Sequence, residues 1–172
     1  SYQRAAYYRG VELFNNTQLK SSNEAFERSL QYTVNPKLTA LAHYWQAECL
    51  YRQNDYTGAI KKYQEFQVLP QASNLPEFTT SQYNIGYCYY RKDSYTEALG
   101  WFRKFVKEKE SADNARYDDA LLRIADCYFV QRDFTPAMDF YNQAIKENSV
   151  ASDYALCQKA TIQGIDNNLK GK

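Results

Sequence analysis

Apolar and aromatic side chains recur along the chain every three or four residues, which is the spacing of one face of an α-helix. The clearest example runs from Tyr89 to Phe102, where two such stretches flank a short polar segment, residues 91–94. This pattern predicts the end of one helix, a tight turn and the start of a second helix. Ser94 and Glu97 have the spacing of a capping box, in which their side chains would satisfy backbone amides where the second helix starts.

The same pattern occurs three times at a constant spacing. Residues 51–59 and 129–137 repeat the order of apolar, polar and aromatic positions of residues 90–98, 39 residues before and 39 residues after it. A period of this length is typical of stacked helical hairpins, because one hairpin alone cannot bury its apolar side. The repeat therefore predicts an all-α solenoid of antiparallel helix pairs.

Extending the period over the whole chain predicts nine helices in a single domain, residues 1–172. Four hairpins are expected at about residues 3–36, 38–75, 79–112 and 117–150, followed by a lone final helix at residues 153–166. Asn35 and Pro36 end the first hairpin, since the residue before a proline avoids helical geometry. Asp55 is expected to cap the second helix of the next hairpin. The final helix either caps the array or belongs to a longer one.

Small residues recur where the two helices of each hairpin are expected to touch. A larger side chain at these points would separate the helix axes and loosen the packing around them. The small residues of the first helices are Gly10, Ala47, Gly86, Ala125 and Gly164, and those of the second helices are Ser22, Ala59, Ala98 and Ala137. Aromatic residues fill the second helices in two rows: Tyr56, Tyr95 and Phe134, then Phe26, Tyr63, Phe102 and Tyr141.

The cysteines do not have the spacing of a disulfide or metal site. Cys49, Cys88 and Cys127 follow the 39-residue period. Equivalent positions on stacked helices lie ~10 Å apart, whereas a disulfide needs Cα atoms within ~7 Å. His43 is the only histidine, so zinc lacks ligands, and we interpret it as a core residue. The three cysteines are expected to be small buried residues, and Cys157, outside this register, to be more exposed.

Charge and composition exclude several classes of function. The chain has 21 basic and 20 acidic residues, a net charge of +1, so it lacks the basic surface that nucleic acid requires. No apolar run is long enough to insert into a bilayer. A single histidine and six scattered glycines leave neither a histidine triad nor a phosphate-binding loop. We predict no enzymatic activity, no cofactor and no metal.

The positions described above resemble those of tetratricopeptide repeats. That family has a small residue in the first helix, a bulky residue three positions later, and an aromatic, an alanine and an aromatic in the second helix. The third repeat has Gly86, Tyr89, Tyr95, Ala98 and Phe102 in these places, the fourth has Ala125, Tyr128, Phe134, Ala137 and Tyr141, and the second has Ala47, Leu50, Tyr56, Ala59 and Tyr63. The first repeat matches less well, with Gly10, Leu13, Leu19, Ser22 and Phe26.

The resemblance implies a right-handed solenoid whose first helices line a concave groove for a partner protein. The period of 39 residues exceeds the family's usual ~34 and resembles tetratricopeptide proteins of the bacterial cell envelope. Family members that bind acidic chaperone tails use lysine and asparagine on the first helices. The matching positions are Tyr7 with Val11, Tyr44 with Glu48, and Tyr83 with Tyr87, so a ligand of that type is not expected.

Aromatic and charged residues on the first helices are the candidate partner-binding groove. Helical periodicity predicts that these positions of the first helices are exposed. Aromatic rings next to charged groups are suited to binding a peptide. The candidates are Tyr7, Phe14, Tyr44, Glu48, Tyr51, Arg52, Tyr83, Tyr87, Tyr90, Arg91, Asp126 and Phe129.

Two functions remain open at this point. The first is a protein-interaction scaffold that holds a peptide or partner segment in its groove. The alternative is a structural segment of a longer repeat protein, possibly of the cell envelope, which docks further repeats or forms homo-oligomers through its C-terminal helix. Free cysteines favour a reducing compartment and the long period favours a bacterial periplasm, so the sequence leaves both cytoplasm and periplasm open.

Overall fold

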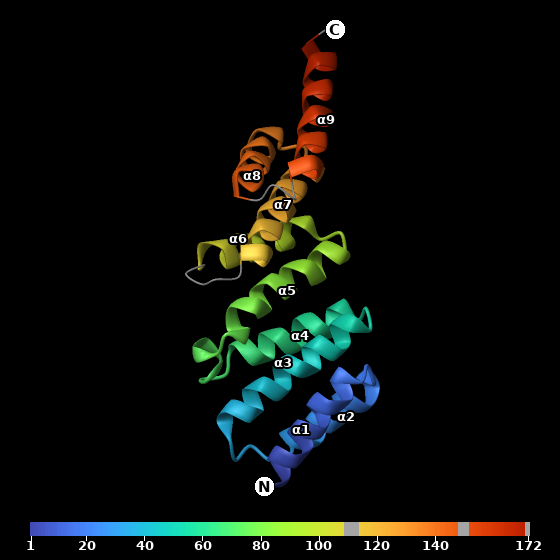
Figure 1. Cartoon of the computed structure of the whole chain (residues 1–172), viewed down its shortest axis with the longest axis vertical. Coiled ribbons are helices and arrows are strands. Elements are labelled where there is room, and N and C mark those ends of the chain that lie inside the picture. Colours follow the sequence, from blue (N-terminus) through green and yellow to red (C-terminus); the bar gives the residue numbers. More distant parts are fainter. Residues whose placement is uncertain (109–113, 148–151, 171–172) are drawn as a thin grey trace. The chain divides into compact units, whose positions relative to one another are not determined.

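The computed structural model of the chain describes residues 1–108, 114–147 and 152–170. These residues form nine α-helices and one short 3-10 turn, and no β-strand occurs among them (Figure 1). The helices are α1 (Tyr2–Asn15), α2 (Leu19–Leu30), α3 (Pro36–Arg52), α4 (Tyr56–Gln67), α5 (Glu77–Arg91), α6 (Tyr95–Lys107), α7 (Asn114–Val130), α8 (Phe134–Glu147) and α9 (Ser152–Lys170), with the 3-10 turn at Ala72–Asn74. The predicted order of helices is therefore confirmed for the described residues.

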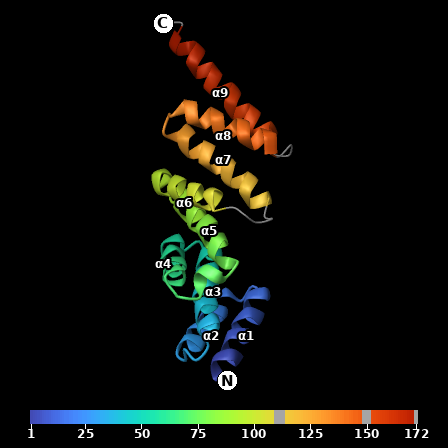
Figure 2. The ribbon, with the colours of Figure 1, turned by 90° about the vertical axis from the view of Figure 1, so that its left-hand side faces the viewer.

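Contacts between Cα atoms divide the chain into two units, Ser1–Lys92 and Asp93–Lys172. In the first unit, α1 packs on α2, α2 on α3, α3 on α4, and α4 on α5, and α1 also touches α3. In the second unit, α7 packs on both α6 and α8, and α8 packs on α9. The helices of a hairpin, such as α1 with α2 and α7 with α8, run side by side in opposite directions (Figure 2).

The turn inside each hairpin places one residue in the left-handed region of the backbone. In the second hairpin, the amide of Asp55 donates to the carbonyl of Leu50 at 2.9 Å, which is the long bond of a Schellman motif. The first and fourth hairpins make the same bond at the same length. The left-handed residues are Thr17, Asn54, Asp93 and Arg132, with φ angles between 56° and 63°, and none of them is glycine.

The ends of the helices confirm one capping prediction, correct another and show a cap that was not predicted. The side chain of Asp55 accepts from the amide of Gly58 at 2.9 Å, as expected. Asn35 has an extended backbone and caps α3 through the amide of Leu38, with Pro36 in the first turn. Ser94 is the N-cap residue of α6, but its side chain makes no capping hydrogen bond. The predicted capping box is therefore wrong at that side chain.

Small residues lie at the crossings of the first two hairpins, as the spacing predicts, but the prediction is wrong for Gly164, which is exposed with nothing within 4 Å of a Cβ built on it. Gly10 is buried, and a Cβ built on it would lie 2.7 Å from the ring of Phe26, so only glycine fits. The hydroxyl of Ser22 donates to the carbonyl of Gly10 at 2.8 Å and ties α2 to α1. Ala47 and Ala59 of the next hairpin have no exposed surface. The helices of a hairpin can therefore approach closely.

The core is aromatic, and the cysteines inside it are thiols. Four rings of the second helices have no exposed surface: Phe26, Tyr63, Phe102 and Tyr141. Cys49, Cys88 and Cys127 are buried and free, whereas Cys157 is exposed, and both predictions are confirmed. Burial raises the pKa of Cys88 and of Cys127 to about 12, so these thiols stay protonated at neutral pH. His43 is partly buried, and burial lowers its pKa.

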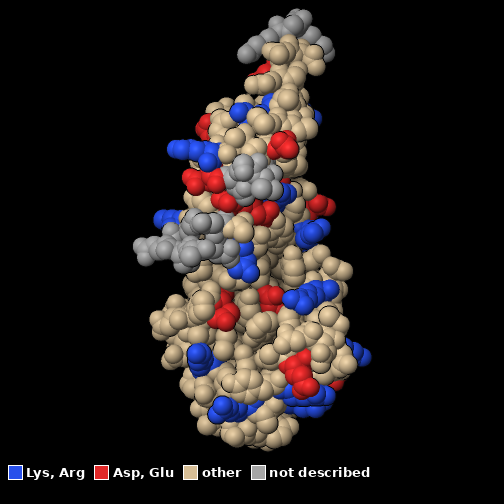
Figure 3. Space-filling view, in the orientation of Figure 1, with Lys and Arg blue, Asp and Glu red and all other residues tan. Residues whose placement is uncertain are grey.

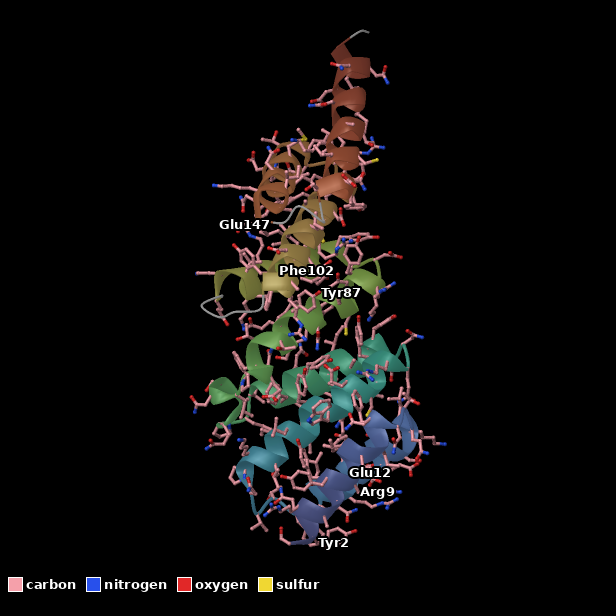
Figure 4. All side chains as sticks on the ribbon, viewed as in Figure 1. Tyr2, Arg9, Glu12, Tyr87, Phe102 and Glu147 are labelled. Carbon is pink, nitrogen blue, oxygen red and sulfur yellow. The ribbon has the colours of Figure 1, made fainter. Side chains whose placement is uncertain are left out.

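Charges of both signs are interspersed over the visible surface. Figure 3 shows basic and acidic side chains mixed along the helices of the face that it displays. On α1, Arg9 and Glu12 form an ion pair of 2.7 Å and lie beside each other in Figure 4. None of the helices that the structure describes has the length and apolar character needed to cross a bilayer.

Candidate partner-binding site

Four of the twelve candidate residues are buried, although periodicity predicted that they are exposed. The exposed fractions are 7% for Tyr7, 4% for Phe14, 6% for Tyr44 and 4% for Asp126. The prediction of exposure is wrong for these four side chains. Each of them is covered by a neighbouring helix, and the covering residue differs from one hairpin to the next.

Tyr7 and Phe14 are covered by the first helix of the second hairpin. The indole of Trp45 on α3 packs edge-on against the ring of Phe14, with centroids 5.0 Å apart. The same indole donates its N–H to the hydroxyl of Tyr7 at 3.1 Å. Because Trp45 spans the space between α1 and α3, both rings belong to the packing between hairpins. Burial also raises the pKa of Tyr7.

Tyr44 is covered by the second helix of its own hairpin. Its ring lies 5.8 Å from that of Tyr63 and 5.5 Å from that of Phe66, both on α4 and both in edge-on geometry. Edge-to-face pairs of this kind stabilise an aromatic core. Tyr44 therefore belongs to the core of the second hairpin.

Glu48 is half-buried and joins three helices of the first unit. Its carboxylate on α3 accepts from the hydroxyl of Tyr63 on α4 at 2.6 Å and from the amide of Asn84 on α5, also at 2.6 Å. The same Asn84 nitrogen lies 3.1 Å from the Tyr63 hydroxyl. Burial, and next the negative charge of Glu48, raise the pKa of Tyr63 well above its ordinary value. This carboxylate is part of the internal packing of the unit.

Asp126 makes an equivalent cluster in the second unit, two repeat periods later. Its carboxylate on α7 accepts from the hydroxyl of Tyr141 on α8 at 2.6 Å and from that of Tyr154 on α9 at 2.9 Å. Arg123 lies 2.7 Å from the other carboxylate oxygen and 5.7 Å from the centre of the Tyr154 ring. The negative charge is thus compensated, and Asp126 links α9 to the preceding hairpin.

The remaining candidates of the first unit keep partial exposure on α3 and α5. On α5, Tyr83 and Tyr87 lie with ring centroids 5.0 Å apart, and Tyr87 and Tyr90 lie 6.2 Å apart. All three rings are half-buried, and Figure 4 labels Tyr87 on α5. Arg52 and Arg91, at the ends of α3 and α5, are exposed. We call the set the tyrosine–arginine strip: Tyr51, Arg52, Tyr83, Tyr87, Tyr90 and Arg91.

One cation–π contact orders the charged part of this strip. The guanidinium of Arg52 lies 4.1 Å from the centre of the Phe14 ring, which is a close cation–π contact. Burial raises the pKa of Tyr51, and the positive charge of Arg91 partly opposes that shift. In the second unit, the last candidate, Phe129, is half-buried against Phe134 at 5.9 Å.

Sequence reasoning did not find the residues that hold these groups. Trp45, Asn84 and Tyr154 were absent from the candidate set, yet each contacts a candidate from another helix. No group of three or more His, Cys, Asp or Glu side chains within the described ranges could hold a metal ion. The geometry offers rings and guanidinium groups, which bind by contact and hydrogen bonding.

The fold defines the class of protein to which this chain belongs, and family models define its family. The stacked antiparallel helix pairs define a helical-repeat protein. A tetratricopeptide repeat model matches residues 7–76 and 71–115, and a second tetratricopeptide repeat model matches residues 119–149. The chain belongs to the tetratricopeptide repeat family. Proteins of this family are generally non-enzymatic scaffolds that bind proteins or peptides.

Solved structures with the same fold share little sequence with this chain. The crystal structure of MamA superposes with a TM-score of 0.70 at 14% identity, covering 88% of this chain and 81% of MamA. YrrB, described as a tetratricopeptide repeat protein with an unusual peptide-binding site, gives 0.70 at 19% identity, covering 92% and 74%. PilF of Pseudomonas aeruginosa gives 0.66 at 17% identity, covering 97% and 76%. A search of curated proteins finds no match.

Proposed function

We propose that this chain is a protein-interaction scaffold that holds a segment of a partner protein on the tyrosine–arginine strip. The observation that carries the proposal is the partial exposure of Tyr83, Tyr87 and Tyr90 on one helix face. Other rings of the same unit, such as Tyr63 and Phe66, have no exposed surface. The tyrosines of α5 therefore keep surface that the core rings of the unit lack.

The strip has the chemistry of a peptide-binding surface. Tyrosine rings give a large contact area and lose little conformational entropy on binding, and arginine is enriched with them at binding hot spots. Arg52 is held by its contact with Phe14, so less side-chain entropy is lost when it pairs with a carboxylate. The strip is thus suited to a peptide with bulky apolar side chains and a carboxylate.

The comparisons support a peptide ligand at the level of the fold. YrrB is described as a tetratricopeptide repeat protein with an unusual peptide-binding site, and its fold covers most of this chain. At 19% identity, the similarity to YrrB supports a shared fold and does not show that this chain binds the same ligand. The proposed peptide contacts therefore rest on the residues of the tyrosine–arginine strip.

A double substitution in the strip tests the proposal. The first step is to select peptides that bind the full chain from a phage-displayed random library. Y87A/Y90A should weaken binding of the selected peptides at least about tenfold, because truncated aromatic hot spots cost about 1–4 kcal/mol each. Its melting temperature should stay close to that of the wild-type chain, since neither ring belongs to the fully buried core.

The matched control removes two tyrosines that are more exposed. Tyr8 is 53% exposed and Tyr32 is 48% exposed, and neither belongs to the strip. Y8A/Y32A should bind the selected peptides as the wild-type chain does. Normal peptide binding by Y87A/Y90A together with a lower melting temperature would assign those rings to the core and contradict the proposal.

A second function, assembly through the last helix, is favoured by the exposed surface of α9. Leu156 is 50% exposed and Leu169 is 69% exposed. Nothing lies within 4 Å of a Cβ built on Gly164, in contrast to Gly10. Sedimentation at increasing concentration tests this function: α9-mediated assembly predicts self-association that L156E abolishes, and a strict monomer would contradict it.

A further inference from the structure

A hollow in the second unit lies outside all of the residues considered so far. Its volume is about 450 Å³, within the size range of ligand pockets, and α6, α7 and α8 line it. Val106, Ile124 and Phe140 supply apolar walls. The remaining lining residues, all on α6, are Gly100, Arg103, Lys104 and Lys107. We call this feature the α6–α8 hollow.

Glycine on one side and an ordered aromatic wall on the other keep the hollow open. Gly100 is exposed in the middle of α6, and nothing lies within 4 Å of a Cβ built there. Phe140 stacks on Tyr128 of α7, with ring centroids 5.9 Å apart and planes 23° apart. The Tyr128 hydroxyl accepts from Arg103 at 3.1 Å, so the wall and one of the cations are held together.

The charge beside the hollow is entirely positive. Three exposed cations of α6 line it, and its lining contains no acidic residue. Lys104 lies 5.2 Å from the centre of the Trp101 ring. Among the described residues, no carboxylate forms an ion pair with Arg103, Lys104 or Lys107. By contrast, Arg9 pairs with an acid on its own helix.

We propose that the α6–α8 hollow is a second docking site, which takes an acidic segment of a partner protein. One bulky apolar side chain of the segment packs against the partly exposed Val106 and Phe140, above the buried Ile124. Carboxylates on either side of it pair with Arg103, Lys104 and Lys107. The charge complementarity selects this occupant, because an acidic segment forms ion pairs with the three cations and a neutral apolar segment does not.

The α6–α8 hollow differs from the tyrosine–arginine strip in both position and chemistry. The hollow is built mainly on second helices of hairpins, whereas the strip is built on α3 and α5, which are first helices. The hollow accepts a side chain into a depression, and the strip offers rings for surface contact. The two sites can therefore be tested separately on the same chain.

The test uses a synthetic fluorescent peptide in which one phenylalanine is flanked by glutamates on both sides. The full chain should bind it, and binding should weaken with added salt. G100L should weaken binding at least about tenfold, because leucine at this position fills the open space. Leucine favours a helix over glycine, so the variant should melt at or above the wild-type temperature and loss of binding cannot reflect unfolding.

Charge reversal and peptide variants complete the test. K104E/K107E should also weaken binding at least about tenfold, while the control K61E, on an exposed position of α4, should not. Y87A/Y90A should bind the acidic peptide normally, which separates this site from the strip. No binding by the wild-type chain, normal binding by G100L, equal binding of a peptide with alanine for phenylalanine, or equal binding of a single-stranded oligonucleotide would each overturn the proposal.

Discussion

At the scale of single residues, a buried or half-buried carboxylate on the first helix is matched by a tyrosine hydroxyl from the second helix. Glu48 pairs with Tyr63, and Asp126 pairs with Tyr141, both at 2.6 Å. A buried charge that kept no partner would be strongly destabilising, so the hydroxyl is required where the acid is present. At the corresponding positions of the other two repeats, where the acid is missing, the ring also lacks the hydroxyl: Val11 occurs with Phe26, and Tyr87 with Phe102.

Removing one hydroxyl tests this pairing. Y63F should lower the free energy of unfolding by about 1.5–3 kcal/mol, because it deletes a hydrogen bond to a charged group inside the unit. The control Y56F removes a hydroxyl that bonds Asn54 at the surface and should change the free energy by less than about 0.5 kcal/mol. Urea unfolding measures both values, and equal small losses would show that the Glu48–Tyr63 bond does not stabilise the fold.

Two buried thiols and a buried tyrosine hydroxyl determine how the free energy of unfolding depends on pH. Burial raises the pKa of Cys88 and Cys127 from 9.0 to about 12, and burial with the charge of Glu48 raises that of Tyr63 well above 10. The folded chain therefore holds these protons more tightly than the unfolded chain. Their stabilising effect is complete below about pH 9 and is lost as the pH rises towards about 12.

Urea unfolding at a series of alkaline pH values measures this dependence. The free energy of unfolding should fall steadily between about pH 9 and pH 11, under reducing conditions that keep the thiols free. C88A/C127A should show a shallower fall, because two of the titrating groups are gone. A free energy that stays constant or rises over this interval would contradict the expected direction.

At the scale of helices, the distance between a glycine and the neighbouring helix decides whether a larger residue can replace it. Gly10 lies against the ring of Phe26, where a Cβ would be 2.7 Å away, and Gly100 faces open space. The same substitution should therefore have opposite effects at the two positions. G10A should lower the free energy of unfolding by about 1–3 kcal/mol through overpacking. G100A should raise it by about 1 kcal/mol through helix propensity.

Thermal and urea unfolding of the two alanine variants check this pair. Each variant serves as the control for the other, since the residue change is identical. If G10A and G100A both stabilised the chain, α1 and α2 could separate at no cost. That result would contradict the tight crossing at Gly10. Two destabilising effects would mean that Gly100 is not in open space, which would also remove the basis of G100L as a test.

Helices and their pairing could be predicted from the sequence, because both depend on local spacing. The helices α1, α3, α5 and α9 start within two residues of the predicted starts at residues 3, 38, 79 and 153, and Asp55 caps α4 as expected. The hydrogen bonding of Ser94 could not be predicted, since it depends on side-chain orientation at the turn. The extension of α9 to Lys170 passes the predicted end at residue 166.

The candidate site could be predicted only in part, because periodicity gives one face of a helix and not what covers it. Tyr7 and Phe14 are covered by Trp45, whose indole is large enough to reach both. A smaller residue at that position would leave both rings more exposed. Tyr87 and Tyr90 lie on the predicted face and keep partial exposure, so their use in binding stays a prediction.

At the scale of the molecule, packing is local within each unit. Contacts join mainly helices that are neighbours along the chain, such as α1 with α2 and α7 with α8. Stability in a helical repeat is then a sum of terms from each repeat and from adjacent interfaces. A substitution in the tyrosine–arginine strip should thus leave the packing around Asp126 unchanged, which makes binding and folding separable.

The central claim is that the tyrosine–arginine strip contacts the partner segment. Fluorine NMR of the full chain labelled with 3-fluorotyrosine, titrated with a phage-selected peptide, tests it most directly. Single tyrosine-to-phenylalanine variants assign the resonances. We predict that the signals of Tyr83, Tyr87 and Tyr90 shift on binding, while those of the buried Tyr63 and Tyr141 do not. Shifts confined to Tyr8 and Tyr32, with the α5 tyrosines unchanged, would contradict the claim.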